Sequence, residues 1–164
     1  REQDWSVVLI DGDTSKRHLS NLLGAPDEPG LTELLRKPEL AFESLVMPTN
    51  IPRLAFLPAG QRDEQASELL ASVRMTTLCA EISRVDAHRA IVFDSSPLLM
   101  SPEAPILASE VGQVVLVVRA NRTPPKSVLQ ARDRLDPKKA ISVVLNQADW
   151  ADKFGLSDYQ PYGA

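Results

Sequence analysis

Several features that would point to particular classes of protein are scarce or missing in this 164-residue sequence. Its one cysteine, Cys79, cannot form a disulfide within the chain, which fits a reducing cytoplasm. No apolar run approaches the roughly 18 residues that a membrane span needs, and no signal peptide opens the chain. A net charge of −4 argues against a nucleic-acid-binding surface. Together these absences predict a cytoplasmic protein with no nucleic-acid partner.

A glycine-rich phosphate loop containing Gly-Lys-Ser or Gly-Lys-Thr is also missing. Such a loop supplies the backbone N–H groups and the lysine that bind a triphosphate. The chain starts at Arg1, without a methionine, only a few residues before a predicted buried strand. We therefore expect it to be a fragment or a processed form of a longer protein.

The residues that are present are ordinary for one globular domain, with 43% hydrophobic and 24% charged residues. Apolar runs typical of buried strands alternate with segments whose apolar residues recur at helical spacing. This alternation predicts an α/β fold, with a mostly parallel sheet flanked by helices on both faces. We expect one domain over residues 1–150 and a flexible, tyrosine-containing tail over residues 151–164. The expected strands are 7–10, 53–57, 90–93, 114–118 and 141–145, and the expected helices are 16–23, 31–35, 64–85 and 127–135.

The most informative stretch runs from Val7 to Arg17. Four apolar residues, three of them β-branched, lead into Asp11 and Asp13, so both acids follow a strand that is buried on both faces. Gly12 is expected to let the backbone turn sharply where the strand ends. Open α/β sheets bind ligands at the carboxyl ends of their strands, and unpaired acids are costly to bury. We therefore expect the two carboxylates to face water or a cation.

Two further predicted strands end in polar residues, Asp94 and Asn146. Because the carboxyl ends of parallel strands lie at one edge of a sheet, these side chains should gather with Asp11 and Asp13. Magnesium binds through one or two carboxylates together with phosphate oxygens and waters, so it is the natural cation for such a group. Each aspartate taken singly fits a turn or a helix cap equally well, and Asn146 alone fits a plain turn. The common placement of the three acids favours a metal and nucleotide site.

Six segments occur in the order seen in bacterial tyrosine kinases of exopolysaccharide synthesis, which the chain resembles from Ser6 to Asp149. The resemblance is strongest to the exosortase-associated branch of these kinases, within the MinD/ParA-like deviant P-loop superfamily. It implies a P-loop NTPase-like fold that here is missing its N-terminal phosphate-loop strand. The segments are VVLIDGDTSKRHLS, GLTELL, LAFLPAG, IVFDSSPLLMSPEAPILA, VVLVVRANRT and VVLNQAD.

The resemblance also implies roles for single residues. In that family the first of these strands carries an Asp-x-Asp motif, which Asp11 and Asp13 match, and the run that ends in Asp94 resembles the Walker B strand. Asp13 and Asp94 would then hold Mg²⁺, and Asp11 or Asp13 would help to activate a tyrosine hydroxyl. Ser95 and Asn146 would contact ATP, with Asn146 against the adenine.

The only tyrosines, Tyr159 and Tyr162, lie in the last six residues. Kinases of this family phosphorylate a C-terminal tyrosine cluster of a neighbouring subunit, which implies autophosphorylation within a homo-oligomer. Two tyrosines at a polar terminus are also compatible with chance. The resemblance further implies a membrane partner, a chain-length determinant or co-polymerase protein, that holds the kinase at the inner face of the plasma membrane and links it to exopolysaccharide or capsule synthesis and export.

Two departures from the family pattern affect the expected activity. Ser15 stands where many members have arginine, and the phosphate loop would precede Arg1 in the family. We therefore expect a protein-tyrosine kinase as the parent protein and negligible kinase activity from these 164 residues alone. The alternatives are a MinD/ParA-type partition or cell-division-site ATPase and a degenerate, non-catalytic regulatory subunit.

Overall fold

The computed structural model describes residues 5–148 of the chain, which divides into two compact units. The first unit ends at Val111 and the second begins at Gly112. The predicted boundary near residue 150 lies at the end of the described residues, so it stays a prediction. Among the described residues, no helix has the length and apolar character required to cross a membrane.

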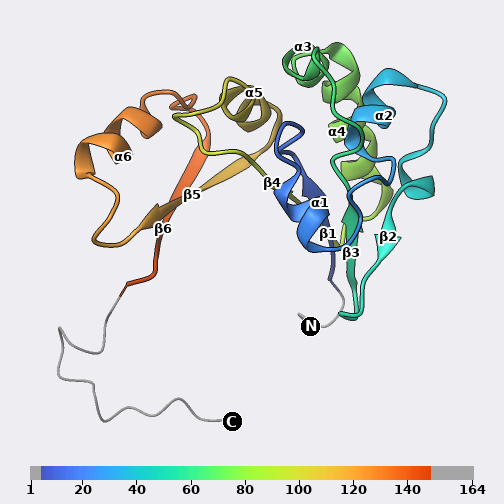
Figure 1. The fold of residues 1–164 in the computed structure, drawn as a ribbon, viewed down its shortest axis with the longest axis horizontal. Helices are drawn as coiled ribbons and strands as arrows, with labels where there is room; N and C mark the ends of the chain where they lie inside the picture. Colours follow the sequence, from blue (N-terminus) through green and yellow to red (C-terminus); the bar gives the residue numbers. More distant parts are fainter. Residues whose placement is uncertain (1–4, 149–164) are drawn as a thin grey trace, which may run out of the picture. The chain divides into compact units, whose positions relative to one another are not determined.

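A four-stranded sheet forms the centre of the first unit, with the strand order β2-β3-β1-β4. Strand β1 lies between β3 and β4 and is parallel to both, whereas the short β2 is antiparallel to β3 (Figure 1). The strands are β1 (Ser6–Asp11), β2 (Met47–Pro48), β3 (Leu54–Leu57) and β4 (Arg89–Asp94). The helices are α1 (His18–Leu22), α2 (Leu31–Arg36), the 3₁₀ helix η2 (Phe42–Ser44), α3 (Ala66–Leu70), α4 (Val73–Val85) and α5 (Glu103–Glu110).

The hydrophobic core of this unit lies between the sheet and helices α2 to α5. Val8 and Ile10 enter it from β1, and Leu57 enters it from β3. The helices contribute side chains at the predicted helical spacing, among them Leu78 and Ile82. Because β1 is flanked by a strand on each side, its carboxyl end is held at the centre of the sheet edge.

Three elements differ from the prediction. The helical pattern over residues 64–85 is two helices: α3 ends at Leu70, and Ser72 caps the start of α4, its Oγ accepting a hydrogen bond from the N–H of Met75 at 3.3 Å. Helix α5 was not predicted, since prolines at 102 and 105 obscure the apolar spacing of Ala104 and Leu107. Strand β2 is only two residues long and carries no periodic signal.

The second unit contains a parallel pair of strands, β5 (Gln113–Arg119) and β6 (Ala140–Asn146), joined through helix α6 (Pro125–Arg132). Pro125 is the first residue of α6, where its missing N–H costs nothing. Among the described residues of this unit, Val118, Ala131 and Leu135 have buried apolar side chains. Both units alternate strands and helices, so the predicted α/β class with a mostly parallel sheet is confirmed.

Candidate functional site

The carboxyl ends of β1 and β4 lie side by side. The register of these parallel strands places Asp11 opposite Asp94, and the N–H of Gly12 donates a hydrogen bond to the carbonyl oxygen of Asp94 at 2.7 Å. The structure therefore brings the acids that end the two strands to one edge of the sheet.

Asp11 is enclosed within this edge, with an exposed fraction of 0%. Its Oδ1 accepts a hydrogen bond from the N–H of Asp13 at 3.1 Å. Its Oδ2 accepts two from Ser20, from the N–H at 2.8 Å and from the hydroxyl at 2.7 Å. Three donors compensate the cost of burying the carboxylate, and they leave Asp11 facing the protein instead of solvent.

Asp13 lies in the loop between β1 and α1 and is 7% exposed. Its Oδ1 accepts a hydrogen bond from the N–H of Lys16 at 3.0 Å, so the side chain stabilises the turn. Among the described residues, no donor reaches its second oxygen, Oδ2. Asp13 is therefore the acid of the Asp-x-Asp pair that has an oxygen left for a ligand.

Asp94 is exposed, and its environment disfavours the charged form. Partial burial raises the pKa of its carboxyl group, the nearby carboxylates of Asp11 and Asp13 raise it further, and His18 opposes the shift. Asp13 and Asp94 are thus the two acids with an oxygen that a divalent cation could bind, and oxygen donors are the ligands that Mg²⁺ prefers. The donor set thus fits magnesium. Within residues 5–148, no group of three or more His, Cys, Asp or Glu side chains is arranged as a metal site.

Gly12 separates the two aspartates of the pair for a reason different from the predicted one. The glycines with positive φ in the described part of the chain are Gly24 and Gly60, so Gly12 is not needed for a left-handed turn. A Cβ at this position would lie 2.6 Å from Cδ2 of Leu107 and 2.7 Å from the carbonyl oxygen of Asp94. Glycine is required here because β1, β4 and α5 approach one another too closely for any side chain.

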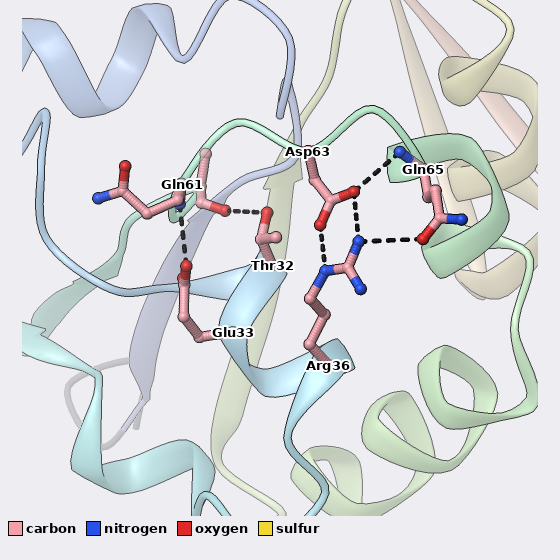
Figure 2. Close-up of polar contacts among 7 residues, drawn as sticks. Thr32, Glu33, Arg36, Gln61, Asp63 and Gln65 are labelled. Carbon is pink, nitrogen blue, oxygen red and sulfur yellow. Dashed lines mark hydrogen bonds and ion pairs between the residues drawn. The ribbon is translucent and has the colours of Figure 1, made fainter.

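The loop after β3 supports the site from the opposite side to β4. The N–H of Ala59 donates to the hydroxyl of Ser20 at 3.0 Å. Helix α2 binds the same loop, since Thr32 Oγ1 donates to the carbonyl oxygen of Ala59 at 2.9 Å and Glu33 Oε1 accepts from the N–H of Gln61 at 3.1 Å. Figure 2 shows the contacts of Thr32 and Glu33 with this loop, together with the ion pair between Arg36 and Asp63. The predicted helix over residues 16–23 contained Ser20, but sequence reasoning did not identify its role. A polar residue on the buried side of that helix was the available signal.

The remaining predicted residues lie next to Asp94, in the second unit or outside the described part of the chain. Ser95 follows Asp94 and is exposed, with its hydroxyl 3.3 Å from the carbonyl oxygen of Ser96. Asn146 ends β6 in the second unit, where its Oδ1 accepts from the N–H of Gln147 at 2.8 Å. Tyr159 and Tyr162 lie outside the described residues. Their predicted roles stay predictions.

Comparisons with known proteins point to one kind of enzyme. No protein-family model matches the chain. The tyrosine-protein kinase Wzc of Salmonella typhi is 32% identical over 159 residues, which cover 95% of this chain and 21% of Wzc. The tyrosine-protein kinase YwqD of Bacillus subtilis is 28% identical over 164 residues, which cover 99% of this chain and 65% of YwqD. The chain thus spans about a fifth of the length of Wzc and about two thirds of YwqD.

Solved structures agree with these relatives. The crystal structure of the VpsO kinase domain superposes with a TM-score of 0.79 and 29% sequence identity, over 90% of this chain and 73% of that chain. The septum site-determining protein MinD from Pyrococcus horikoshii, in complex with Mg-ADP, superposes with a TM-score of 0.56 at 16% identity, over 88% of this chain and 70% of that one. The second likeness shows the fold alone, and it confirms the predicted P-loop NTPase-like architecture.

Proposed function

We propose that this chain, a homologue of bacterial tyrosine-protein kinases, carries the magnesium-binding part of the nucleotide site of such a kinase. The observation that carries the proposal is the register of β1 and β4, which sets Asp11 opposite Asp94 at the carboxyl edge of the sheet. Two acids that repel one another at this edge, in a chain related to kinases, are best explained by a cation and the phosphates that it binds.

The hydrogen bonds that each aspartate accepts indicate its proposed role. Asp13 and Asp94 would hold Mg²⁺, because they present the carboxylate oxygens that the protein does not occupy. The cation would neutralise the charge of the phosphates of ATP. Asp13 is also the better candidate to accept the proton of a tyrosine hydroxyl, since the oxygens of Asp11 already accept three hydrogen bonds. We further propose that Ser95 and Asn146 contact the nucleotide.

A phosphate loop would have to complete this site. Losing a single preorganised donor at a developing charge costs roughly 3 kcal/mol of transition-state stabilisation, and the whole set of donors is missing from these residues. Carboxylates alone repel a triphosphate. We therefore propose that the 164 residues by themselves bind ATP poorly and have negligible kinase activity.

In the whole protein, the proposed activity is tyrosine autophosphorylation that regulates the synthesis and export of exopolysaccharide or capsule. Tyr159 and Tyr162 are the proposed acceptors, reached by the site of a neighbouring subunit in a homo-oligomer. The proposed location is the inner face of the plasma membrane, through a chain-length determinant or co-polymerase protein. The support is the homology to bacterial tyrosine-protein kinases.

The test is phosphotyrosine formation by the full-length protein with Mg-ATP. We expect phosphotyrosine in the wild type, a loss of at least tenfold in Asp13→Asn and Asp94→Asn, and no change in Asp86→Asn, which alters an acid before the amino end of β4, at the opposite edge of the sheet. Release of phosphate to water without any phosphotyrosine would instead support the ATPase alternative, for which the fold likeness to MinD is the favouring observation. If the protein forms neither phosphotyrosine nor free phosphate, the result would support the non-catalytic alternative.

A further inference from the structure

We infer that Ser20 is a positioning residue: its hydroxyl connects the loop after β3 to Asp11 and thereby sets the place of Asp13, the acid that meets the cation. This inference rests on the proposed nucleotide site and goes beyond it, because it gives Ser20 a role in that site and explains what holds Asp13 in place. Asp11 holds the loop after β1 in place, and Asp13 binds the cation.

The hydroxyl of Ser20 is used in both directions. It accepts a hydrogen bond from the N–H of Ala59 at 3.0 Å and donates one to Oδ2 of Asp11 at 2.7 Å. Ser20 is 1% exposed, so water does not compete for either bond. Because the Ala59 N–H fixes the oxygen as an acceptor, the hydroxyl proton is directed to Asp11.

The chain of contacts continues from Asp11 to Asp13. With Oδ2 taken by the N–H and the hydroxyl of Ser20, Oδ1 of Asp11 accepts the N–H of Asp13 at 3.1 Å. Ala59 of the loop after β3, Ser20 of α1, Asp11 at the end of β1 and Asp13 of the following loop are therefore connected by consecutive hydrogen bonds. Loss of the Ser20 hydroxyl removes the connection between the β3 loop and the acids and leaves the N–H of Ala59 unpaired in a buried place.

The neighbouring Thr32 offers a matched control. Its hydroxyl is also buried, at 3% exposure, and it also binds Ala59, through the carbonyl oxygen at 2.9 Å. Among the described residues, the Thr32 hydroxyl makes no hydrogen bond with an acid of the site. Ser20→Ala and Thr32→Val thus each remove one buried hydroxyl group that hydrogen-bonds to the backbone of Ala59. Only Ser20→Ala breaks the series of hydrogen bonds that leads to Asp13.

The experiment compares these variants in the full-length protein. The first readout is Tm without ligand, and we expect both variants to lower it by a few degrees. The second is the Mg²⁺ concentration that gives half of the Tm increase caused by saturating ADP. We expect Ser20→Ala to raise that concentration by about tenfold, as loss of a residue that orients a metal ligand does, and Thr32→Val to leave it at the wild-type value. Asp11→Asn should behave as Ser20→Ala does, and the double variant should be no worse than Asp11→Asn alone.

Equal Mg²⁺ dependence in Ser20→Ala and Thr32→Val would overturn the inference, because Ser20 would then contribute stability alone. If Ser20→Ala does not fold, Ser20→Thr replaces it: the hydroxyl is kept, so Tm falls through overpacking while the Mg²⁺ dependence must stay at the wild-type value. A tenfold shift in Ser20→Thr would contradict the assignment. A wild type that binds Mg-ADP without forming phosphotyrosine would end the kinase proposal and still allow this comparison.

Discussion

Gly12→Ala is the substitution that the geometry of the site most directly predicts to be destabilising. The new Cβ would lie 2.6 Å from Cδ2 of Leu107 and 2.7 Å from the carbonyl oxygen of Asp94, well inside the separation of about 3.5–4.0 Å at which carbon atoms pack. The leucine side chain can move aside. The carbonyl oxygen cannot, because it belongs to the backbone of β4 and accepts the N–H of Gly12 at 2.7 Å.

The expected cost has two parts. Overpacking of a close junction costs roughly 1–3 kcal/mol, and loss of the hydrogen bond between Gly12 and Asp94 adds about 1 kcal/mol. Gly12→Ala should therefore lower the free energy of unfolding by about 2–4 kcal/mol. It should also weaken the binding of Mg-ADP, because Asp13 follows Gly12 directly and would be displaced from Asp94.

Urea unfolding followed by circular dichroism measures the first effect, with Gly112→Ala as the control. No atom lies within 4 Å of a Cβ built at Gly112, and its φ is not in the left-handed region. The control should change the free energy of unfolding by less than about 1 kcal/mol, towards higher stability. A Gly12→Ala protein that is as stable as this control and binds Mg-ADP like the wild type would refute the reasoning.

Three further predictions follow from individual side chains. Thr14 is 3% exposed and its Oγ1 has no hydrogen-bond partner among the described residues. Thr14→Val should therefore leave the free energy of unfolding in urea unchanged or raise it by up to about 1 kcal/mol. A decrease of more than about 1 kcal/mol would mean that the hydroxyl has a partner in solution. Burial, with a smaller contribution from Glu110, raises the pKa of Cys79 to about 11. Alkylation of this thiol by iodoacetamide at pH 8 should therefore be far slower in the native protein than in the unfolded protein. Equal rates would contradict the burial of Cys79. Arg36 lowers the pKa of Asp63, so this ion pair stabilises the fold at pH values above the ordinary carboxyl pKa, and the stabilisation is lost as the pH falls through the lowered pKa. Arg36→Met should therefore reduce the difference between the urea midpoints at pH 7 and pH 3. An unchanged difference would show that the exposed pair contributes nothing to stability.

Local patterns were sufficient for every described strand except the two-residue β2, and for the edge at which the acids lie. The apolar run before Asp11 and the run before Asp94 each predicted a buried strand, and parallel pairing then leaves no freedom about which edge both acids share. The same reasoning failed for α5, where prolines interrupt the spacing, and at Ser72, where one polar residue divides a continuous helical pattern into two helices. Capping is decided by one hydrogen bond, which an average over a window of residues does not detect.

The sequence by itself determined the α/β class, the acids that end β1 and β4 and the kinship to tyrosine kinases, because all three depend on residue order and on apolar periodicity. The resemblance already assigned the cation to Asp13 and Asp94, and the tertiary structure supplied the physical reason. Ser20 and the N–H of Asp13 occupy the oxygens of Asp11, whereas one oxygen of Asp13 has no donor among the described residues. The tertiary structure also decided why residue 12 is glycine, since the approach of Leu107 and the carbonyl oxygen of Asp94 joins segments that are far apart along the chain. Contacts of this kind depend on packing between distant segments, which no local pattern records.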